Sequence, residues 1–337
     1  MRKLKVGIIG AGRIGKVHAE SILYHVPEAE VKAISDISMD YVQNVADSLG
    51  IPNAYDDYKK ILEDPEIDAV LICSSTDTHS PISIEAANAG KHIFCEKPID
   101  YNLERIYKTL DVVEKSGVKY QVGFNRRFDH NYARVNEVIK EGKIGTPQII
   151  KITSRDPKPA PIEYLKGSGG MFFDLAIHDF DMARFQAGSE VKEVYAVGDC
   201  LVDPEIGKIG DIDTAVTTLK FENGTIAVID NSRQAVYGYD QRIEVFGSKG
   251  SVEIKNDTAT TTIIRNEDSI QSEKPLYFFL ERYMGSFVEE IKQFIKAIVN
   301  DTEVPVVGFD GLQPVKIAMA ATLSVKEKRP VKISEIK

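Results

Sequence analysis

The sequence of 337 residues has few cysteines and no excess of basic residues. Cys73, Cys95 and Cys200 are odd in number and widely spaced, so they indicate neither a disulfide framework nor a zinc site. Cys73 and Cys95 lie in apolar runs, where a small buried thiol is expected. The 42 Lys and Arg residues against 51 Asp and Glu residues give a net charge of −9. This balance disfavours nucleic acids and anionic membranes as partners, because both would require a basic face.

Long apolar runs, internal repeats and low-complexity segments are also missing, and no segment approaches the length that spans a bilayer. The start, MRKLKVGIIGAGRIG, places charges before an apolar stretch as a secretory signal does, but this stretch is short and Gly10 and Gly12 interrupt it. With 43% hydrophobic and 28% charged residues, the composition is typical of a soluble globular protein. We therefore expect a cytoplasmic protein whose length allows two domains.

Residues 1–123 alternate short branched or apolar runs with stretches of helical spacing. The apolar runs read KVGII, EVKAIS, AVLICS, HIFC and YQVGF. Such alternation is typical of a parallel sheet with helices on both faces. We expect a doubly wound α/β Rossmann domain over residues 1–123.

After residue 124 the pattern changes to that of an α+β domain, expected over residues 124–337. MFFDLAIHDFDMARF is predicted to be one helix, whereas Val191 to Arg265 alternates and turns as a large, mainly antiparallel open sheet does. Two helical stretches close the chain, and the one near residues 312–327 can pack back on the first domain. Ligands of such proteins favour the cleft between domains, outside the carboxyl ends of the strands.

Residues 10–15 read Gly-Ala-Gly-Arg-Ile-Gly, between a predicted strand and a predicted helix. In this motif the first glycine permits a tight turn, the second lets the backbone approach a pyrophosphate and the third allows close packing of helix and strand. A second strand ends at Asp36, whose carboxylate can accept hydrogen bonds from both adenosine ribose hydroxyls and would repel a 2′-phosphate. The motif predicts NAD rather than NADP, and a purely structural glycine turn is the alternative.

Two further strand ends add polar residues beside this motif. The stretch CSSTDTHSP places hydroxyls where a parallel sheet meets its ligand, although they could equally be helix caps. KHIFCEKPID, residues 91–100, ends an apolar strand in Glu96-Lys97-Pro98 and so places an ammonium group at its carboxyl end. The residues expected to contact the cofactor are Gly10, Gly12, Arg13, Ile14, Gly15, Asp36, Ser74, Ser75, Thr76, His79, Glu96 and Lys97.

On a helical wheel, Asp174, His178 and Asp181 fall on one narrow stripe bordered by apolar side chains. Asp174 and His178 are four residues apart, so the carboxylate can orient the ring as a base that removes a hydroxyl proton. A satisfied core pair without chemistry is the alternative. A metal site is not expected, because this spacing lacks a convincing third ligand.

Taken together, the glycine motif, CEKP at 95–98 and the Asp174…His178 pair resemble the glucose–fructose oxidoreductase, inositol dehydrogenase and rhizopine-catabolism (Gfo/Idh/MocA) family. The resemblance spans essentially the whole chain. FNRRFD at 124–129, SRDPKPAP at 154–161 and AVYGYDQR at 235–242 are most similar to inositol 2-dehydrogenases.

This resemblance implies that Lys97, Asp174 and His178 are catalytic. It also implies that the open face of the second sheet pairs with another subunit, in a dimer or tetramer. The substrate pocket would be lined by Lys97, Arg127, Arg155, Asp156, Asp174, His178 and Tyr239.

The function expected from these features is NAD-dependent oxidation of a secondary hydroxyl of a cyclic polyol, first of all myo-inositol to 2-keto-myo-inositol (scyllo-inosose). Ser154 and Asp156 stand where some inositol dehydrogenases have a histidine and an asparagine, which leaves the preferred isomer open. The nearest alternative is a dehydrogenase of a hexose, sugar acid or sugar phosphate. An alternative of another class is a non-catalytic NAD-binding sensor.

Overall fold

The computed structural model describes residues 2–337, which form two compact units. Unit 1 comprises the chain up to Phe128 together with Ser286–Gln313, and unit 2 comprises Asp129–Gly285 and Pro314–Lys337. The chain passes from one unit to the other within helices α11 (Phe279–Val299) and α12 (Gly308–Glu327).

These units differ from the two continuous stretches that the sequence suggested. Residues 286–313 belong to unit 1, because Ile291, Phe294 and Ile295 of α11 are buried in its apolar core. The first residues of α12, up to Gln313, belong to unit 1 with the second part of α11, whereas residues from Pro314 onward belong to unit 2. Packing of the stretch 312–327 on the first domain stays a prediction.

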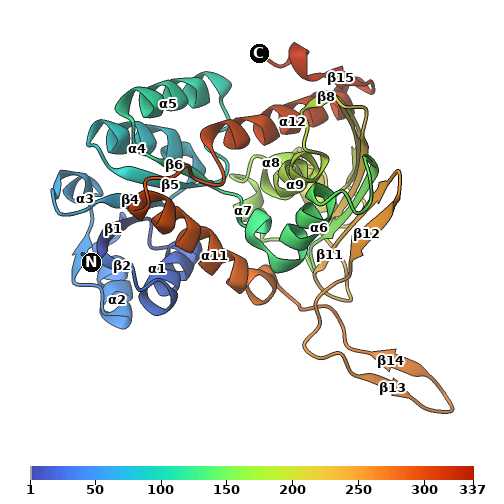
Figure 1. Ribbon diagram of the computed structural model, residues 1–337, viewed down its shortest axis with the longest axis horizontal. Helices are drawn as coiled ribbons and strands as arrows, with labels where there is room; N and C mark the ends of the chain where they lie inside the picture. The colour runs from blue at the N-terminus through green and yellow to red at the C-terminus, as the bar shows by residue number, and fades with distance from the viewer. Residues whose placement is uncertain (1) are drawn as a thin grey trace. The chain divides into compact units, whose positions relative to one another are not determined.

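Unit 1 contains a six-stranded, entirely parallel sheet in the order β3-β2-β1-β4-β5-β6, as the sequence predicted for a Rossmann domain (Figure 1). β4 is fully buried, which explains its continuous apolar run: helices cover both faces of a parallel sheet. The strands are β1 (Leu4–Ile9), β2 (Ala29–Ser35), β3 (Asn53–Tyr55), β4 (Ala69–Ile72), β5 (His92–Glu96) and β6 (Tyr120–Gly123).

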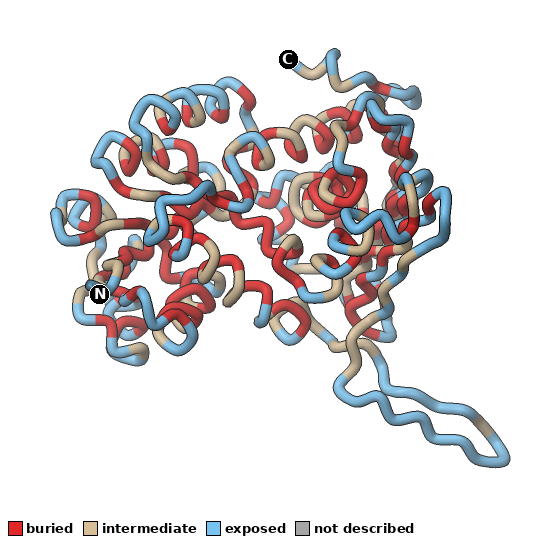
Figure 2. Tube along the Cα trace, in the orientation of Figure 1, coloured by how far each residue is buried: buried red, intermediate tan, exposed pale blue. Residues whose placement is uncertain are grey.

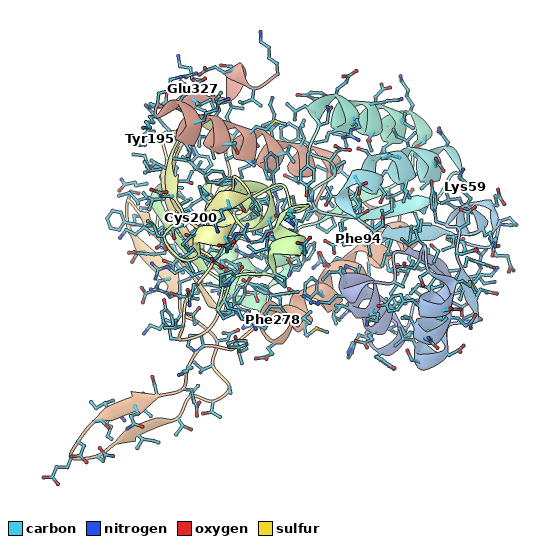
Figure 3. All side chains as sticks on the ribbon, turned by 180° about the vertical axis from the view of Figure 1, so that it is seen from behind. Lys59, Phe94, Tyr195, Cys200, Phe278 and Glu327 are labelled. Atoms are coloured by element: carbon cyan, nitrogen blue, oxygen red, sulfur yellow. The ribbon has the colours of Figure 1, made fainter. Side chains whose placement is uncertain are left out.

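Helices of unit 1 lie on both faces of its sheet (Figure 1). α1, α2 and the second part of α11 pack on one face, where Phe94 of β5 joins their apolar core. Figure 3 labels Phe94 among these side chains, and α4 and α5 lie on the other face. The helices are α1 (Arg13–His25), α2 (Met39–Leu49), α3 (Lys59–Glu63), α4 (Thr76–Asn88), α5 (Leu103–Ser116) and the 3₁₀ helix η1 (Asn125–Phe128).

Unit 2 contains a seven-stranded sheet in the order β12-β11-β7-β10-β9-β8-β15. All of its neighbouring pairs are antiparallel except β7 with β10, so the predicted mainly antiparallel sheet is confirmed. The strands are β7 (Pro147–Arg155), β8 (Val191–Asp199), β9 (Thr214–Phe221), β10 (Ile226–Ser232), β11 (Asp240–Gly247), β12 (Gly250–Ile254) and β15 (Val331–Lys332).

One face of this sheet carries the helices of unit 2, and the opposite face is open (Figures 1 and 2). Along β8, β9 and β10, buried and exposed residues alternate, as expected for a half-buried sheet. The helices are α6 (His130–Lys140), α7 (Ile162–Leu165), α8 (Met171–Asp174), α9 (Ile177–Ala187), α10 (Pro204–Lys208) and the 3₁₀ helix η2 (Ile333–Glu335).

The open face is apolar over several strands. Val197 of β8 lies directly opposite Val216 of β9, and these side chains are 56% and 49% exposed. Tyr195, labelled in Figure 3, lies two residues from Val197 and therefore on the same face. Ile149, Ile226, Val228 and Phe246 are also exposed on their strands.

A hairpin arm extends from unit 2 between β12 and α11 (Figure 1). Its strands β13 (Ile263–Arg265) and β14 (Ile270–Ser272) are exposed along their whole length (Figure 2).

Among residues 2–337, no helix is both long and apolar enough to cross a membrane.

Candidate active site

The predicted glycine turn lies between β1 and α1, at the carboxyl edge of the parallel sheet of unit 1. Gly10 has a φ of +99°, and a Cβ there would come within 2.6 Å of the backbone of Cys73 and Ser74. A Cβ on Gly15 would lie 1.9 Å from the carbonyl oxygen of Gly10, so helix and strand could not approach as they do. The fold itself thus requires glycine at both positions.

Gly12 differs from the other two glycines of the motif. It is the N-cap residue of α1, is exposed, and a Cβ placed on it would meet no atom of the chain within 4 Å. Packing within the described chain therefore gives no reason for glycine at this position. The reason that remains is the close approach of a ligand's phosphates to the backbone at the helix start, so the residues present fit a dinucleotide.

Asp36 directly follows β2 at the same edge. Its Oδ2 accepts a hydrogen bond from the backbone N–H of Ala11 at 2.9 Å, which ties the carboxylate to the glycine turn. Arg13 and Ile14 begin α1 beside it. The structure therefore brings Asp36 and the glycine motif together, as the sequence predicted.

Of the polar residues after β4, some lie at the start of α4 and one, His79, is buried. Ser75 is the N-cap residue of α4 and Thr76 its first residue, whereas the Ser74 hydroxyl lies 2.6 Å from that of Thr78. His79 is buried, with Nδ1 2.8 Å from the carbonyl oxygen of Pro98 and Nε2 3.0 Å from that of Ser74. His79 thus joins the segments that follow β4 and β5.

Two carbonyl oxygens around one imidazole favour a ring that carries both of its protons. Burial opposes this charge, but Cys95 and the carbonyls of Pro98 and Ser74 outweigh burial and raise the pKa of His79 to about 9. The geometry indicates that His79 holds the Lys97-Pro98 segment, whose peptide bond is cis. Direct contact of His79 with a cofactor stays a prediction.

Lys97 lies immediately after β5, and the Glu96 side chain supports its backbone. Oε2 of Glu96 accepts the N–H of Lys97 at 3.3 Å, while its Oε1 lies 2.7 Å from Nε2 of the buried His18. The ring of His18 packs edge-on against Phe94 and Phe287. Glu96 is therefore part of an internal cluster that holds Lys97, a contact that the sequence did not reveal.

Glu290 of α11 completes this cluster, and both of its carboxylate oxygens are buried without a hydrogen-bond partner. Burial, together with the nearby charge of Glu96, raises the pKa of Glu290 well above its usual range. Both effects favour the uncharged, protonated form of Glu290.

Ligand atoms of His18, Glu96 and Glu290 lie within 4.8 Å of one another, a grouping that could hold a metal ion. A metal-binding imidazole normally donates its second N–H to an acceptor, whereas Nδ1 of His18 is buried without a hydrogen-bond partner. The hydrogen bond between His18 and Glu96 lies beside Glu290, and the lack of an acceptor for Nδ1 of His18 argues against a metal ion in this cluster.

In unit 2, the predicted single helix over residues 171–185 proved to be two helices, and this part of the sequence interpretation is corrected. The N–H of Ala176 binds the carbonyl of Met171, five residues back, instead of a carbonyl four residues back. This local widening separates α8 from α9 and shifts Asp174 relative to His178 on the helix surface. Such irregularities occur often at functional sites.

Asp174 and His178 are both partly buried. Oδ1 of Asp174 accepts the hydroxyl of Tyr164 at 2.9 Å, and Oδ2 lies 3.0 Å from NH1 of Arg233. The third residue of the predicted stripe, Asp181, is buried and lies 3.8 Å from Arg184. Tyr164 and Arg233 hold the candidate catalytic carboxylate, and sequence reasoning missed both.

The four other predicted substrate-binding residues lie in different settings. Arg127 of η1 pairs with Asp310 at 3.0 Å, within unit 1. In unit 2, Tyr239 is buried and its ring packs edge-on against Tyr283. The backbone of Asp156 hydrogen bonds with Ser232, the last residue of β10, and with Ala235 after it.

Arg155 is predicted to bind substrate together with Asp174, but the two residues lie on opposite sides of the sheet of unit 2. Ser154 of β7 is buried, so its neighbour Arg155 points to the opposite, open face of the sheet. There its Nε pairs with Asp230 at 2.6 Å. Strand alternation thus places Arg155 on the face opposite the helices, and its contact with substrate stays a prediction.

The fold agrees with comparisons to known proteins. Residues 4–124 match the model of an oxidoreductase family with an NAD-binding Rossmann fold, and residues 132–253 match the C-terminal domain model of the Gfo/Idh/MocA family. The chain belongs to the Gfo/Idh/MocA family. It is therefore an NAD-dependent oxidoreductase, as the glycine motif and Asp36 indicated.

Several known proteins are similar to this chain over its full length. An uncharacterized oxidoreductase of Bacillus subtilis, YrbE, is 52% identical over 98% of this chain and 97% of its own. A myo-inositol 2-dehydrogenase of Thermotoga maritima is 49% identical over 99% of both chains.

Solved structures of dehydrogenases are also similar to this chain over its full length. The crystal structure of a probable dehydrogenase from Thermotoga maritima has a TM-score of 0.97 and 49% identity, covering 99% of this chain and 100% of that one. Scyllo-inositol dehydrogenase from Lactobacillus casei, solved with NAD(H) and scyllo-inositol, has a TM-score of 0.93 and 31% identity, covering 99% and 100%.

We predict that Asp36 sets the preference for NAD. The ratio of kcat/KM with NAD to that with NADP should be at least about tenfold, because a carboxylate facing a 2′-phosphate pairs like charges. Asp36→Ala should narrow this ratio, whereas Asp40→Ala, which changes an exposed carboxylate in the first turn of α2, should leave it unchanged. Equal use of both cofactors by the unsubstituted protein would contradict the assignment.

Proposed function

We propose that this protein is an inositol 2-dehydrogenase, which oxidises one secondary hydroxyl of a cyclic polyol, in the first place myo-inositol, to a ketone. The observation that carries the proposal is the 49% identity, over 99% of both chains, with the myo-inositol 2-dehydrogenase of Thermotoga maritima. The Lactobacillus casei structure with bound scyllo-inositol supports the same substrate class.

The proposal assigns a separate role to each candidate catalytic residue. When bound, NAD supplies the acceptor for the hydride that leaves the carbinol carbon. His178 accepts the hydroxyl proton, and Asp174 steadies the positive charge that the ring gains. The ammonium of Lys97 stabilises the developing negative charge on the substrate oxygen.

Local geometry supports these roles within each unit. In unit 1, Glu96 and His79 fix the backbone on both sides of Lys97, so the ammonium is carried by a held segment. In unit 2, Tyr164 and Arg233 fix both oxygens of Asp174. Catalytic groups held by such contacts need little reorganisation when charge develops.

The residues that would hold the cofactor lie at the carboxyl edge of the sheet of unit 1. The backbone at Gly12 and the start of α1 would bind the pyrophosphate, and Asp36 would bind the adenosine ribose. We also propose that the protein is cytoplasmic and acts as a homo-oligomer, a dimer or tetramer paired through the open sheet face of unit 2. An apolar face of this extent is unusual on a monomer.

Substitution of Lys97 tests the proposed chemistry. With myo-inositol as substrate, Lys97→Ala should lower kcat by about a hundredfold, roughly 3 kcal/mol, which is typical of one lost electrostatic contact. His178→Ala should cost at least as much, whereas Lys108→Ala, on the exposed side of α5, should change nothing. NAD affinity, measured by fluorescence titration, should stay within a few-fold because Lys97 is not assigned to the phosphates.

Three outcomes would count against the proposal. A near-normal kcat for folded Lys97→Ala would show that the lysine is only a turn residue. Faster turnover of a hexose, sugar acid or sugar phosphate than of any inositol, in a side-by-side panel, would move the substrate class to the sugars. Failure to reduce NAD with any of these compounds would favour a non-catalytic sensor.

The open face of unit 2 predicts the state of assembly. Light scattering at micromolar concentration should report more than one chain, and Val216→Lys should weaken the assembly because it places a charge in the apolar face. Tyr107→Lys, at an exposed aromatic residue of α5, is the matched control and should not change the mass. A mass near 37.5 kDa for the unsubstituted protein would refute the assembly.

A further inference from the structure

Arg233 is the largest fully buried side chain of the chain's described part, with an exposure of 1%. It directly follows β10, and its backbone N–H donates to the carbonyl of Asp213 at 2.8 Å. Arginine is almost never buried without partners, since a desolvated guanidinium is costly. The reason for its position must lie in the groups that it contacts.

Two carboxylates bind the guanidinium from different segments. NH1 lies 3.0 Å from Oδ2 of Asp174, and NH2 lies 3.2 Å from Oδ2 of Asp211. Oδ1 of Asp211 in turn accepts the backbone N–H of Met171, the first residue of α8, at 2.9 Å. Since Asp174 is the last residue of α8, Arg233 and Asp211 together fix both ends of this short helix.

We propose that Arg233 is a positioning residue of the proposed reaction: it holds the Asp174 carboxylate in one orientation and compensates part of its negative charge. This inference rests on the roles proposed above for Asp174 and His178. Without the guanidinium, Asp174 would attract a proton on His178 more strongly, and His178 would be ready to accept the substrate proton only at higher pH.

Other polar and charged groups near Arg233 and Asp174 are carboxylates or a neutral hydroxyl. Asp156 also acts electrostatically on the guanidinium, so three carboxylates, those of Asp156, Asp174 and Asp211, act on Arg233. Burial lowers the pKa of Arg233, but these three carboxylates outweigh burial and raise it, so the cation persists at all working pH values. The Tyr164 hydroxyl donates to Asp174 but carries no positive charge.

Charged residues of α9 have partners of their own. Asp179 accepts a hydrogen bond from Asn231 at 2.8 Å, and Asp181 lies 3.8 Å from Arg184. Arg184 itself is buried and pairs with Glu190 at 2.6 Å. Arg184 therefore provides a matched control: a second buried, carboxylate-paired arginine of the same unit, on which no catalytic role rests.

The test measures how kcat/KM depends on pH in variants of Arg233. In Arg233→Met, the acid limb of kcat/KM should move upward by about one pH unit and kcat should fall about tenfold, because both charge and orientation are lost. Arg233→Lys keeps the positive charge but cannot contact Asp174 and Asp211 at the same time as the guanidinium does. In this variant kcat should therefore fall, while the acid limb of kcat/KM should stay at the same pH. Arg184→Met should lower Tm without moving the limb.

A second readout does not depend on catalysis. The NMR titration of His178 in the substrate-free protein should have a higher midpoint in Arg233→Met than in the unsubstituted protein. If polyol oxidation fails altogether, this titration still decides the inference, so its failure and that of the proposed function are distinguishable. If Arg233→Met does not fold, the double variant Arg233→Met/Asp211→Asn, which removes one charge of each sign, takes its place.

An unchanged acid limb and an unchanged His178 midpoint in a folded variant would overturn the proposal. They would reduce Arg233 to a structural anchor of α8. A shift of equal size in Arg184→Met would overturn it as well, because the effect would then follow from general destabilisation of unit 2.

Discussion

Parallel pairing of β1 with its two neighbours is the constraint on which the candidate cofactor site depends. Beyond the strand ends, the N–H of Gly10 donates to the carbonyl of Ser35 at 2.8 Å, and the N–H of Cys73 donates to that of Ile9 at 2.7 Å. These bonds bring the glycine turn, Asp36 and Ser74 to one edge of the sheet. Because β5 pairs in the same direction, the segment that carries Lys97 begins there too.

Unit 2 depends on a different principle, the pairing of buried charge. Its sheet buries only one face, and on that side a single guanidinium links the start and end of α8 through two carboxylates. In unit 1, by contrast, burial raises the pKa of Glu290 and so favours the uncharged form of a buried carboxyl group. In each unit one of the polar groups that support a candidate catalytic residue comes from a segment far away in the sequence: His18, which contacts Glu96, in unit 1 and Arg233, which contacts Asp174, in unit 2.

This distance explains what the sequence could and could not predict. The parallel sheet, the antiparallel sheet and the glycine turn depend on local patterns, and the structure confirms them. Arg233 binds partners in segments far from it, so no spacing rule could reveal it. The break between α8 and α9 carries neither proline nor an internal glycine to mark it. The orientation of Arg155, in contrast, follows from strand alternation and could have been predicted.

The most direct test of the central claim follows the hydrogen that leaves the substrate. Myo-inositol carrying deuterium on the carbon of its 2-hydroxyl is incubated with the protein and NAD, and the NADH formed is examined by NMR. The account predicts that one deuterium appears on the nicotinamide ring for each ketone formed, and that Lys97→Ala and His178→Ala greatly slow its transfer. NADH that carries no deuterium, or the absence of any NADH with the cyclic polyols, would contradict it.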